Sequence, residues 1–505
     1  MSPSSPSESV LPQTPVRRVV IAGGGTAGWM AAAAICKLLG RTLEVTLVES
    51  EDIGTIGVGE ATIPTMLTFH RLLGIDEQAF MAASQATIKL GISFEGWRDP
   101  DHRYLHSFGI TGKDHWSAGF QHFWMRGRER GLAEDYPAYC IELQAALRHR
   151  FAHLSDYRMN YAYHLDAGRY ARFLRGISET HGCRRIEGRI AEVITDPDSG
   201  LIRALQLADG STIEGDLFVD CTGFRALLIG QTLGVGFEDW SHWLLNDSAI
   251  ATQTAAVRPP APYTRAIAEP WGWQWRIALQ HRMGNGIVYA SRHVDDDTAR
   301  ARLLSSIEGE RLREPLQLRF RPGRRLRSWH GNCIAIGLSA SFIEPLESTT
   351  IHLIQRGIVR LLQAFPQVLA APAIAEYNAR MDEELQHVRD FVILHYHATE
   401  RRDSAYWRYV AEMPLPDTLQ HRIDLFRDTG TVYHVPGELF AENSWIQVML
   451  GQGIVPRHRH PVPDLMGDEE LRGFLAAVRA DVERTVDALP AHHDYLQRYC
   501  PAAPA

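Results

Sequence analysis

The sequence predicts an α/β fold organised around a dinucleotide-binding module, and three observations support this prediction. A short β-branched run, 19–22, is followed by a glycine turn and then by an Ala-rich helical segment. Gly23, Gly25 and Gly28 have G-x-G-x-x-G spacing, which allows a tight turn, close approach of a pyrophosphate and close packing of helix on strand. A second apolar run ends at Glu49, where an acid can hold a ribose hydroxyl. The unit indicates FAD or NAD binding; the alternative is an incidental glycine turn.

The composition is that of a globular protein with a large core. The chain has 505 residues, of which 45% are hydrophobic and 22% charged. Its net charge of −8 and the lack of basic runs argue against nucleic-acid binding. The longest apolar stretch, 29–40, contains Lys37 and is shorter than the about 20 residues that a membrane helix needs. We therefore expect no nucleic acid and no membrane among its partners.

The cysteines and the N-terminal segment bear on the compartment. Six cysteines lie far apart without a C-x-x-C pair, so the sequence predicts neither a zinc site nor a disulfide framework, and a cytoplasmic location fits. Arg17-Arg18 before an apolar run resembles an export signal, but the glycine motif inside that run favours a mature strand. Residues 1–15 are rich in Ser and Pro and are predicted to form a disordered tail.

A glycine loop, a helix and a strand follow the second strand of the module. The segment 52–64 predicts either a loop beside a flavin ring or a surface turn, and 66–86 has a helical pattern. In 88–97 apolar residues alternate with polar ones, so a single strand places Lys89 opposite the apolar face. On this pattern alone, Lys89 is more readily a solvated strand lysine than a catalytic one.

The middle of the chain predicts further parts of an FAD-binding fold. Residues 97–150 are rich in histidine and aromatic residues and predict an aromatic pocket or ordinary core, and 161–174 predicts a helix with Asp166 near its start. A buried strand, 217–220, leads to the Thr222-Gly223 turn. This arrangement resembles the second half of the glutathione-reductase type of FAD-binding fold, in which 190–193 would pass the adenine.

A tryptophan-rich segment and an anion-binding helix start come next. Residues 270–292 predict a β-hairpin that turns at 284–286, with Trp271, Trp273 and Trp275 on one strand face as an aromatic wall or as core. Another buried strand, 333–337, leads to an amphipathic helix from about residue 350.

Ser348 and Thr349 are good N-cap residues for that helix, whose first N–H groups are free to bind an anion or a flavin carbonyl. Glu347 is an ordinary acid of the first turn or a catalytic carboxylate. Helical patterns over 373–413 and 468–489 complete the chain.

The predicted fold is therefore an α/β, Rossmann-type, glutathione-reductase-like FAD module with an interleaved β-sheet segment and a mainly helical C-terminal part. We expect the FAD module to span 16–365, with substrate-side segments at about 97–160 and 240–320. Residues 366–505 are expected to close the substrate pocket.

Five motifs together resemble the flavin-dependent tryptophan halogenases, from Arg18 to about Pro463. They are GGGTAGW (23–29), IGVGEATIP (56–64), the lysine in IKLGISFEGW (88–97), WGWQWRI (271–277) and FIEPLESTTIH (342–352). One glycine motif is a weak signal, but the combination is specific. The resemblance implies an FADH2-dependent halogenase that uses O2 and chloride or bromide to halogenate an aromatic, indole-like substrate.

The resemblance also implies the cofactor site and the partners. Halide would bind at Thr349 and Thr350, a separate NAD(P)H flavin reductase would supply FADH2, and the chain would form a homodimer by default. FAD would lie against Gly23, Gly25, Thr26, Ala27, Gly28, Glu49, Ser50, Ile53, Ile56, Glu60, Ala61, Ile190, Leu338 and Ile351.

By the same resemblance, hypohalous acid would pass through a tunnel to Lys89, which hydrogen-bonds it or is transiently halogenated. Glu347 would stabilise the cationic ring carbon and take its proton. His106 and Phe108 resemble the residues between which the family holds an indole ring. Trp273 and Trp275 would stand between the flavin and the substrate.

Two departures from the family pattern bear on specificity. Ala278 replaces the proline expected after the W-x-W-x-I motif. Residues 443–453 lack the Tyr-Tyr pair with which tryptophan-specific members hold the amino-acid backbone, although Trp445 is placed to stack on an aromatic ring. We therefore expect indole, or a larger indolic or phenolic compound, to be a better substrate than tryptophan.

Three alternatives remain at this point. A flavin monooxygenase of the same fold would need direct access of substrate to flavin, and a non-catalytic flavin-binding protein would have no use for Lys89 and Glu347. A zinc enzyme is disfavoured because His395 and His397 are two residues apart and no third ligand is evident.

Overall fold

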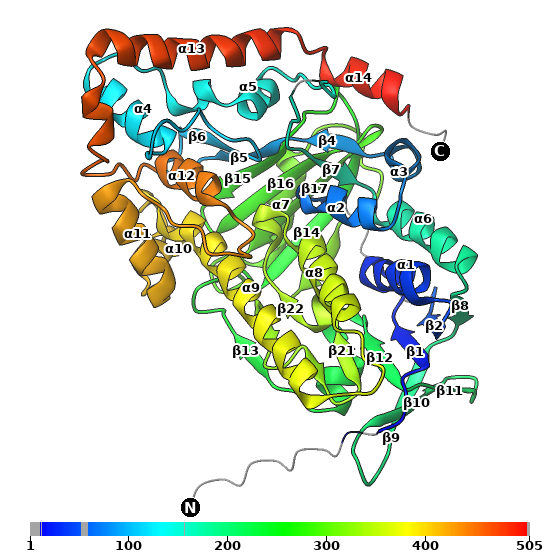
Figure 1. The fold of residues 1–505 in the computed structure, drawn as a ribbon. Helices are drawn as coiled ribbons and strands as arrows, with labels where there is room; N and C mark the ends of the chain where they lie inside the picture. Colours follow the sequence, from blue (N-terminus) through cyan, green and yellow to red (C-terminus); the bar gives the residue numbers. More distant parts are fainter. Residues whose placement is uncertain (1–10, 12, 52–58, 156, 502–505) are drawn as a thin grey trace, which may run out of the picture.

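The structure is a computed structural model that describes residues 11, 13–51, 59–155 and 157–501 of the chain. The positions expected for Ile53 and Ile56, and most of the expected tail, lie outside these residues. Figure 1 shows a parallel-sheet module at one side, a larger twisted sheet at the centre and a helical part at the other side.

The glycine motif lies in a six-stranded sheet with the order β20-β21-β12-β1-β2-β8. All its strands except β20 run parallel, and β1 is buried on both faces, as parallel sheets covered by helices require. The strands are β1 (Arg18–Ala22), β2 (Glu44–Glu49), β8 (Arg184–Glu187), β12 (Leu217–Asp220), β20 (Trp329–His330) and β21 (Cys333–Ala335). Together with the helices described below, this sheet confirms the predicted α/β class.

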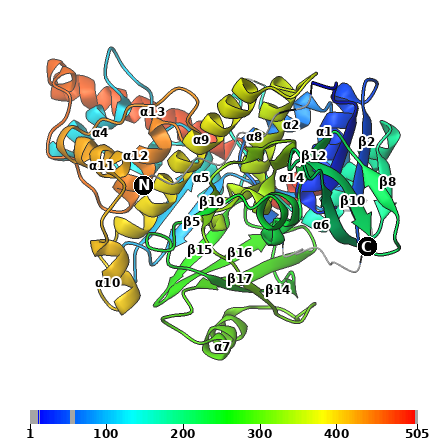
Figure 2. The ribbon, with the colours of Figure 1, turned by 90° about the horizontal axis from the view of Figure 1, so that it is seen from below.

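A seven-stranded sheet, ordered β18-β14-β17-β16-β15-β5-β6, occupies the centre. Its neighbours are antiparallel except for β15 and β5, and α7 (Asp296–Ser306) covers its outer side in the view from below (Figure 2). The strands are β5 (Gly91–Glu95), β6 (Arg103–Ser107), β14 (Ser248–Ala255), β15 (Thr264–Glu269), β16 (Gly272–Ala278), β17 (Arg282–Tyr289) and β18 (Leu316–Arg319). Two segments far apart in the sequence thus share one sheet.

Three smaller sheets of three strands each accompany the six-stranded and seven-stranded sheets. They are β9 (Ile190–Thr195), β10 (Ile202–Leu207) and β11 (Thr212–Glu214); β13 (Phe237–Asp239), β19 (Gly323–Arg325) and β22 (Ser341–Phe342); and β3 (Glu60–Ala61), β7 (Ala162–Leu165) and β4 (Thr87–Lys89). The first protrudes from the parallel-sheet module in Figure 1.

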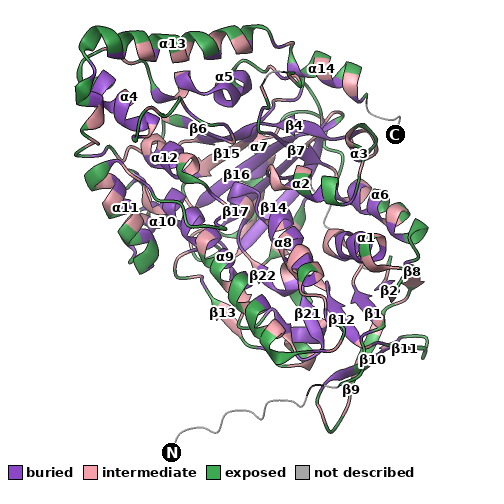
Figure 3. Ribbon diagram, viewed as in Figure 1, coloured by how far each residue is buried: buried purple, intermediate pink, exposed green. Residues whose placement is uncertain are grey.

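Helices cover both sheets and form the C-terminal part. Buried residues follow the central strands, whereas α13 presents an exposed outer face (Figure 3). The helices are α1 (Thr26–Leu39), α2 (Thr65–Leu72), α3 (Glu77–Ser84), α4 (Phe120–Glu129), α5 (Ile141–Leu147), α6 (Ala167–Thr180), α8 (Thr350–Gln363), α9 (Ala371–His397), α10 (Ala405–Glu412), α11 (Asp417–Thr429), α12 (Glu442–Gly451), α13 (Asp468–Asp487) and α14 (His492–Tyr499). Within the described ranges, no helix combines the length and the apolar character needed to cross a membrane.

Several predicted elements are interrupted in the structure. The helix expected over 66–86 is two helices, α2 and α3, because Gly74 takes a φ of +54° between them. The strand expected over 88–97 is split into β4, which pairs with β7, and β5, which pairs with β15 and β6. The segment 161–174 starts as strand β7, and Asp166 then caps α6 by accepting a hydrogen bond from the Arg169 N–H.

The predicted hairpin forms, but it turns elsewhere. Residues 284–286 lie inside β17, and the chain reverses at 279–281, where the Leu279 N–H donates to the Arg282 carbonyl. Gly286 is needed opposite Trp275, since a Cβ there would stand 2.0 Å from the Trp275 ring. Trp273 and Trp275 lie on β16, whereas Trp271 precedes the strand and is only partly buried.

All six cysteines are free and buried. The remaining helix predictions are confirmed, one of them with a break. The helices expected from residue 350 and over 468–489 are α8 and α13, and the long pattern over 373–413 divides into α9 and α10.

Candidate active site

The glycine turn is shaped to hold a pyrophosphate. Gly23 has a φ of +108°, and a Cβ at Gly28 would stand 1.8 Å from the Gly23 carbonyl oxygen, so neither position accepts a side chain. A Cβ at Gly25 would meet no atom within 4 Å, which leaves the space that a ligand needs. α1 begins at Thr26, and its first N–H groups face this space. The turn therefore fits a dinucleotide.

Two acids are among the expected FAD contacts: Glu49 lies against the glycine turn, and Glu60 lies in β3, paired with Leu165 of β7. Glu49 ends β2, and its carboxylate accepts hydrogen bonds from Trp29 Nε1 at 3.2 Å and from Arg185 Nε at 2.6 Å. Burial raises the pKa of Glu60 to about 7, although Arg282 opposes the shift. The other expected FAD contacts lie at the turn, at the ends of neighbouring elements or in β9: Ala27, Ser50, Ala61, Ile190, Leu338 and Ile351.

Lys89 is fully buried at the end of β4, so the structure excludes the solvated-lysine alternative. Its Nζ donates hydrogen bonds to the Thr62 carbonyl oxygen at 3.0 Å and to Ser348 Oγ at 2.8 Å, and lies 5.2 Å from the centre of the Phe108 ring. Burial lowers the pKa of Lys89 to about 7, while the negative charge of Glu347 opposes this shift. Both protonation states are therefore populated near neutral pH.

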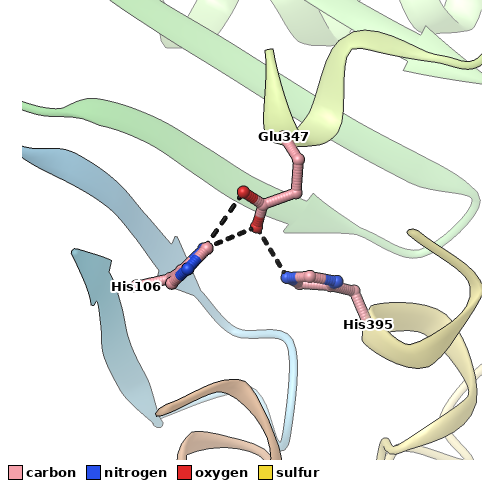
Figure 4. Close-up of side chains that lie close together, drawn as sticks. All are labelled: His106, Glu347 and His395. Atoms are coloured by element: carbon pink, nitrogen blue, oxygen red, sulfur yellow. Dashed lines mark hydrogen bonds and ion pairs between the residues drawn. The ribbon is translucent and has the colours of Figure 1, made fainter. Parts of the chain in front are cut away.

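Glu347 is fully buried between two histidines (Figure 4). His106 Nδ1 lies 3.0 Å from both carboxylate oxygens, and His395 Nε2 lies 2.8 Å from Oε1. Burial alone would raise the pKa of Glu347, but His106 and His395 outweigh it and lower the pKa to about 2. Nδ1 of His395 also lies 2.8 Å from the Phe391 carbonyl oxygen, so each ring nitrogen of His395 lies close to an oxygen atom.

These three residues form a set of possible metal ligands that the sequence did not reveal. His395 lies with His106 and Glu347, and His397, which is close to it in the sequence, is not part of the set. One possible ligand atom from each of the three residues lies within 4.8 Å of the other two. Their 2.8–3.0 Å separations are hydrogen-bond lengths, whereas a zinc ion holds ligand atoms roughly 3.3 Å apart. We therefore assign the contacts as hydrogen bonds that orient Glu347.

The start of α8 lies next to this cluster in the chain. Ser348 has a φ of +60°, an uncommon conformation for a non-glycine residue, and its hydroxyl accepts the Lys89 hydrogen bond. Thr349 occupies the N-cap position without a capping hydrogen bond from its side chain, contrary to the expected capping role. Thr349 is buried, Thr350 opens the helix, and the first N–H groups of α8 remain available to an anion.

The tryptophan pair is buried beside a second acid that sequence reasoning missed. The ring centres of Trp273 and Trp275 are 6.2 Å apart. Trp273 Nε1 donates to Glu344 Oε2 at 2.8 Å. Glu344 belongs to the same EPLEST motif as Glu347, so its place in that motif was the available signal.

The polar side chains of α12 hold the segment 107–111. Gln447 Oε1 accepts from the Ser107 N–H at 2.8 Å, and Asn443 Oδ1 accepts from the Thr111 N–H at 3.0 Å. Trp445 is buried, with its ring 4.8 Å from that of Phe391 in an edge-on arrangement. These amides are occupied by backbone and are not free to bind an ammonium or carboxylate group.

Comparisons with known proteins agree with this arrangement. The sequence profile described as "Tryptophan halogenase" matches residues 18–468. The tryptophan 7-halogenase RebH of Lentzea aerocolonigenes is 35% identical, with 96% of this chain and 98% of the relative covered. The tryptophan 6-halogenase SttH of Streptomyces toxytricini is also 35% identical, with 95% and 97% covered.

Solved structures are similar over almost the whole chain. Xcc4156, a flavin-dependent halogenase from Xanthomonas campestris, superposes with a TM-score of 0.96 at 65% identity, covering 97% of this chain and 100% of that one. BrvH, a flavin-dependent halogenase from Brevundimonas sp. BAL3, gives a TM-score of 0.92 at 44% identity, with 96% and 99% covered.

Proposed function

Because the chain belongs to the tryptophan halogenase family and is a flavin-dependent halogenase, we propose that it uses FADH2, O2 and chloride or bromide to halogenate an aromatic, indole-like substrate through hypohalous acid directed by Lys89. The observation that carries the proposal is the buried Lys89 amine, held by Ser348 at the start of α8 and in the field of Glu347. When bound, reduced flavin supplies, together with O2, the oxidising power that converts halide into hypohalous acid.

The chain's own residues would hold the flavin and the halide. Gly23, Gly25 and the N-terminus of α1 cradle the pyrophosphate, and Glu49 faces the ribose. The N–H groups of Thr349 and Thr350 bind the halide, because a helix start favours an anion and its burial keeps competing water away.

Lys89 would direct the oxidant. In its protonated state the amine would donate a hydrogen bond to hypohalous acid, which increases the electrophilicity of the halogen. In its neutral state it would take the halogen from hypohalous acid, so that an N–halogen bond forms, the O–halogen bond breaks and the amine proton leaves with the hydroxide as water. A pKa of about 7 gives access to both states at physiological pH. The hydrogen bonds to Thr62 and Ser348 fix the position of Nζ.

Glu347 would stabilise the substrate cation. Its pKa of about 2 keeps the carboxylate ionised at neutral pH, so it faces the positive charge that develops on the ring. A halogenated ring cation is a very strong acid, and even a weakly basic carboxylate accepts its proton. His106 and His395 hold both oxygens in place.

Substrate and partners follow from the same site. His106 and Phe108 would hold an indole ring, with Trp445 nearby in the pocket, and we propose a separate NAD(P)H flavin reductase as the source of FADH2. Since Asn443 and Gln447 are occupied by backbone, free indole should bind better than tryptophan. A homodimer is the oligomer we propose.

The chain offers a well-matched test, because it has three lysines and only Lys89 is buried. Wild type, Lys89→Ala and the exposed-site control Lys113→Ala are incubated with FAD, a flavin reductase, NADH, O2, indole and bromide or chloride. Mass spectrometry should find the halogen isotope pattern with wild type and Lys113→Ala and lose it, by at least about 100-fold, with Lys89→Ala.

Three outcomes would contradict the proposal. A hydroxylated product would identify a monooxygenase of the same fold, and equal halogenation by Lys89→Ala would mean that the oxidant acts free in solution. Flavin binding without any turnover would identify a binding protein.

A further inference from the structure

A single oxygen of Glu344 gathers three hydrogen-bond donors behind the tryptophan pair. Oε2 accepts from Tyr396 OH at 2.6 Å, from Trp273 Nε1 at 2.8 Å and from Asn246 Nδ2 at 2.8 Å. Glu344 is 1% exposed, and within the described residues no Lys, Arg or His forms an ion pair with it. Burial raises the pKa of this carboxyl, and the three donors oppose the shift.

These donors come from elements that are far apart in the sequence. Trp273 lies on β16, Asn246 precedes β14, and Tyr396 lies in the last turn of α9. Tyr406 of α10 extends the network by donating to Asn246 Oδ1 at 3.2 Å. One carboxyl oxygen therefore connects the central sheet to the helical part at the position of the Trp273 ring.

The network also shares a short turn of chain with the reacting residues. Glu344 immediately precedes the 3₁₀ helix Pro345–Glu347, which ends in Glu347 and is followed by Ser348, the partner of Lys89. Trp273 is anchored through its N–H, whereas Trp275 Nε1 has no hydrogen-bond partner within the described part of the chain. The Trp273 ring therefore has one side-chain hydrogen bond that fixes its orientation, and Glu344 is the acceptor.

We propose that Glu344 is a positioning residue that fixes the Trp273 ring and thereby sets the fraction of oxidising equivalents that reaches Lys89. The inference rests on the proposed function. In the productive outcome FADH2, O2, halide and a proton give FAD, hypohalous acid and water. In the wasteful outcome FADH2 and O2 give FAD and hydrogen peroxide, so the ratio of halogenated product to peroxide measures the partition.

The first test measures this ratio at saturating flavin, halide and indole. Glu344→Gln replaces the carboxyl group with an amide, in which one of the two oxygens becomes an NH2 group that cannot accept a hydrogen bond, and Trp273→Phe removes the N–H while keeping an aromatic ring. Each should lower halogenated product per NADH about three- to tenfold and raise peroxide correspondingly. The double variant should lose no more than Trp273→Phe alone, because both changes act on the same hydrogen bond. The exposed-site control Glu470→Gln should match wild type.

The second test needs no turnover. In flavin-free protein labelled with ¹⁵N-tryptophan, the Trp273 Nε1–H resonance, assigned by its loss in Trp273→Phe, should move and exchange faster with solvent in Glu344→Gln. Tyr396→Phe removes one other donor to the same oxygen and gives a milder probe if Glu344→Gln folds poorly. It should shift the same resonance, whereas Tyr409→Phe, outside the network, should not.

The inference is overturned if the product-to-peroxide ratio is unchanged in Glu344→Gln and Tyr396→Phe, or if the losses in the double variant multiply. A folding defect alone would lower the melting temperature and the amount of active enzyme while leaving that ratio unchanged. If wild type itself gives no halogenated product, the proposed function fails, and the resonance still decides whether Glu344 holds Trp273.

Discussion

Replacing Gly286 with alanine should displace Trp275. Gly286 on β17 is paired with Trp275 on β16, and an added Cβ would lie 2.0 Å from Cζ2, 2.1 Å from Cη2 and 2.5 Å from Cε2 of the ring. Carbon atoms in contact prefer about 3.5–4.0 Å. The Trp275 ring must therefore move by about 1.5 Å.

The expected free-energy change is the balance of two terms. Overpacking a buried site costs about 1–3 kcal/mol. Gly286 does not have a positive φ, so alanine fits the strand backbone and regains about 0.5–1 kcal/mol by restricting the unfolded chain. The net loss of unfolding free energy is then about 0–2.5 kcal/mol, with a midpoint of about 1 kcal/mol.

Thermal unfolding followed by near-UV circular dichroism reports both the stability and the tryptophan packing. Gly286→Ala should melt below wild type with an altered aromatic signal. The matched control Gly473→Ala lies within α13, where an added Cβ meets nothing within 4 Å, and should melt above wild type. A Gly286→Ala protein that melts at or above the wild-type temperature with an unchanged aromatic spectrum would refute the assigned packing of Trp275.

Three other predictions concern the glycine turn, the acid Glu60 in β3 and the substrate. Gly25→Ala should leave the melting temperature of flavin-free protein nearly unchanged but weaken FAD binding at least tenfold in a fluorescence titration. Gly28→Ala should instead destabilise the fold, because its Cβ would stand 1.8 Å from the Gly23 carbonyl oxygen. Equal FAD affinity of Gly25→Ala and wild type would count against the phosphate site. Burial raises the pKa of Glu60 from its ordinary value of 4.5 to about 7. Between these two pH values the native state binds more protons than the unfolded state. Wild type therefore loses stability as the pH rises through this window. Urea unfolding at pH 5 and pH 8 should therefore show Glu60→Gln gaining stability relative to wild type at the higher pH, and a constant difference would disprove the shift. Finally, kcat/KM for indole should exceed that for tryptophan, and the reverse order would contradict the assignment of Asn443 and Gln447 to backbone.

Local features were predictable because their causes are local. The glycine turn needs a positive φ at Gly23 and an absent side chain at Gly28, and both requirements follow from residue type and spacing. The break at Gly74 has the same kind of cause and could have been read from the glycine. The G-N-G hairpin signal failed because Gly286 serves a contact with Trp275 on the partner strand, which a turn rule does not consider.

The surroundings of Lys89 depend on contacts that the alternating apolar and polar pattern of 88–97 does not predict. The pattern of 88–97 predicts one strand with an apolar and a polar face, but it does not reveal that Ser348, 259 residues away in the turn before α8, accepts a hydrogen bond from Lys89. It also does not show that the chain changes sheets at Leu90, whose N–H donates to the Pro262 carbonyl. Only the resemblance to a family placed this lysine in a site, and the structure supplies the burial that lowers its pKa.

The two acids of the EPLEST motif show why roles cannot be assigned from residue type. Both are buried, and burial raises the pKa of each. Glu347 faces two histidines, which reverse the shift and bring its pKa to about 2, whereas Glu344 faces only neutral donors, and its pKa stays raised. The difference depends on partners 48 and 241 residues from Glu347 and on Tyr396, 52 residues from Glu344. An acid that stays ionised is suited to stabilising positive charge near Lys89. An acid that accepts hydrogen bonds from neutral N–H and O–H groups is suited to fixing an aromatic ring. Two acids only three positions apart in the sequence are therefore suited to different functions.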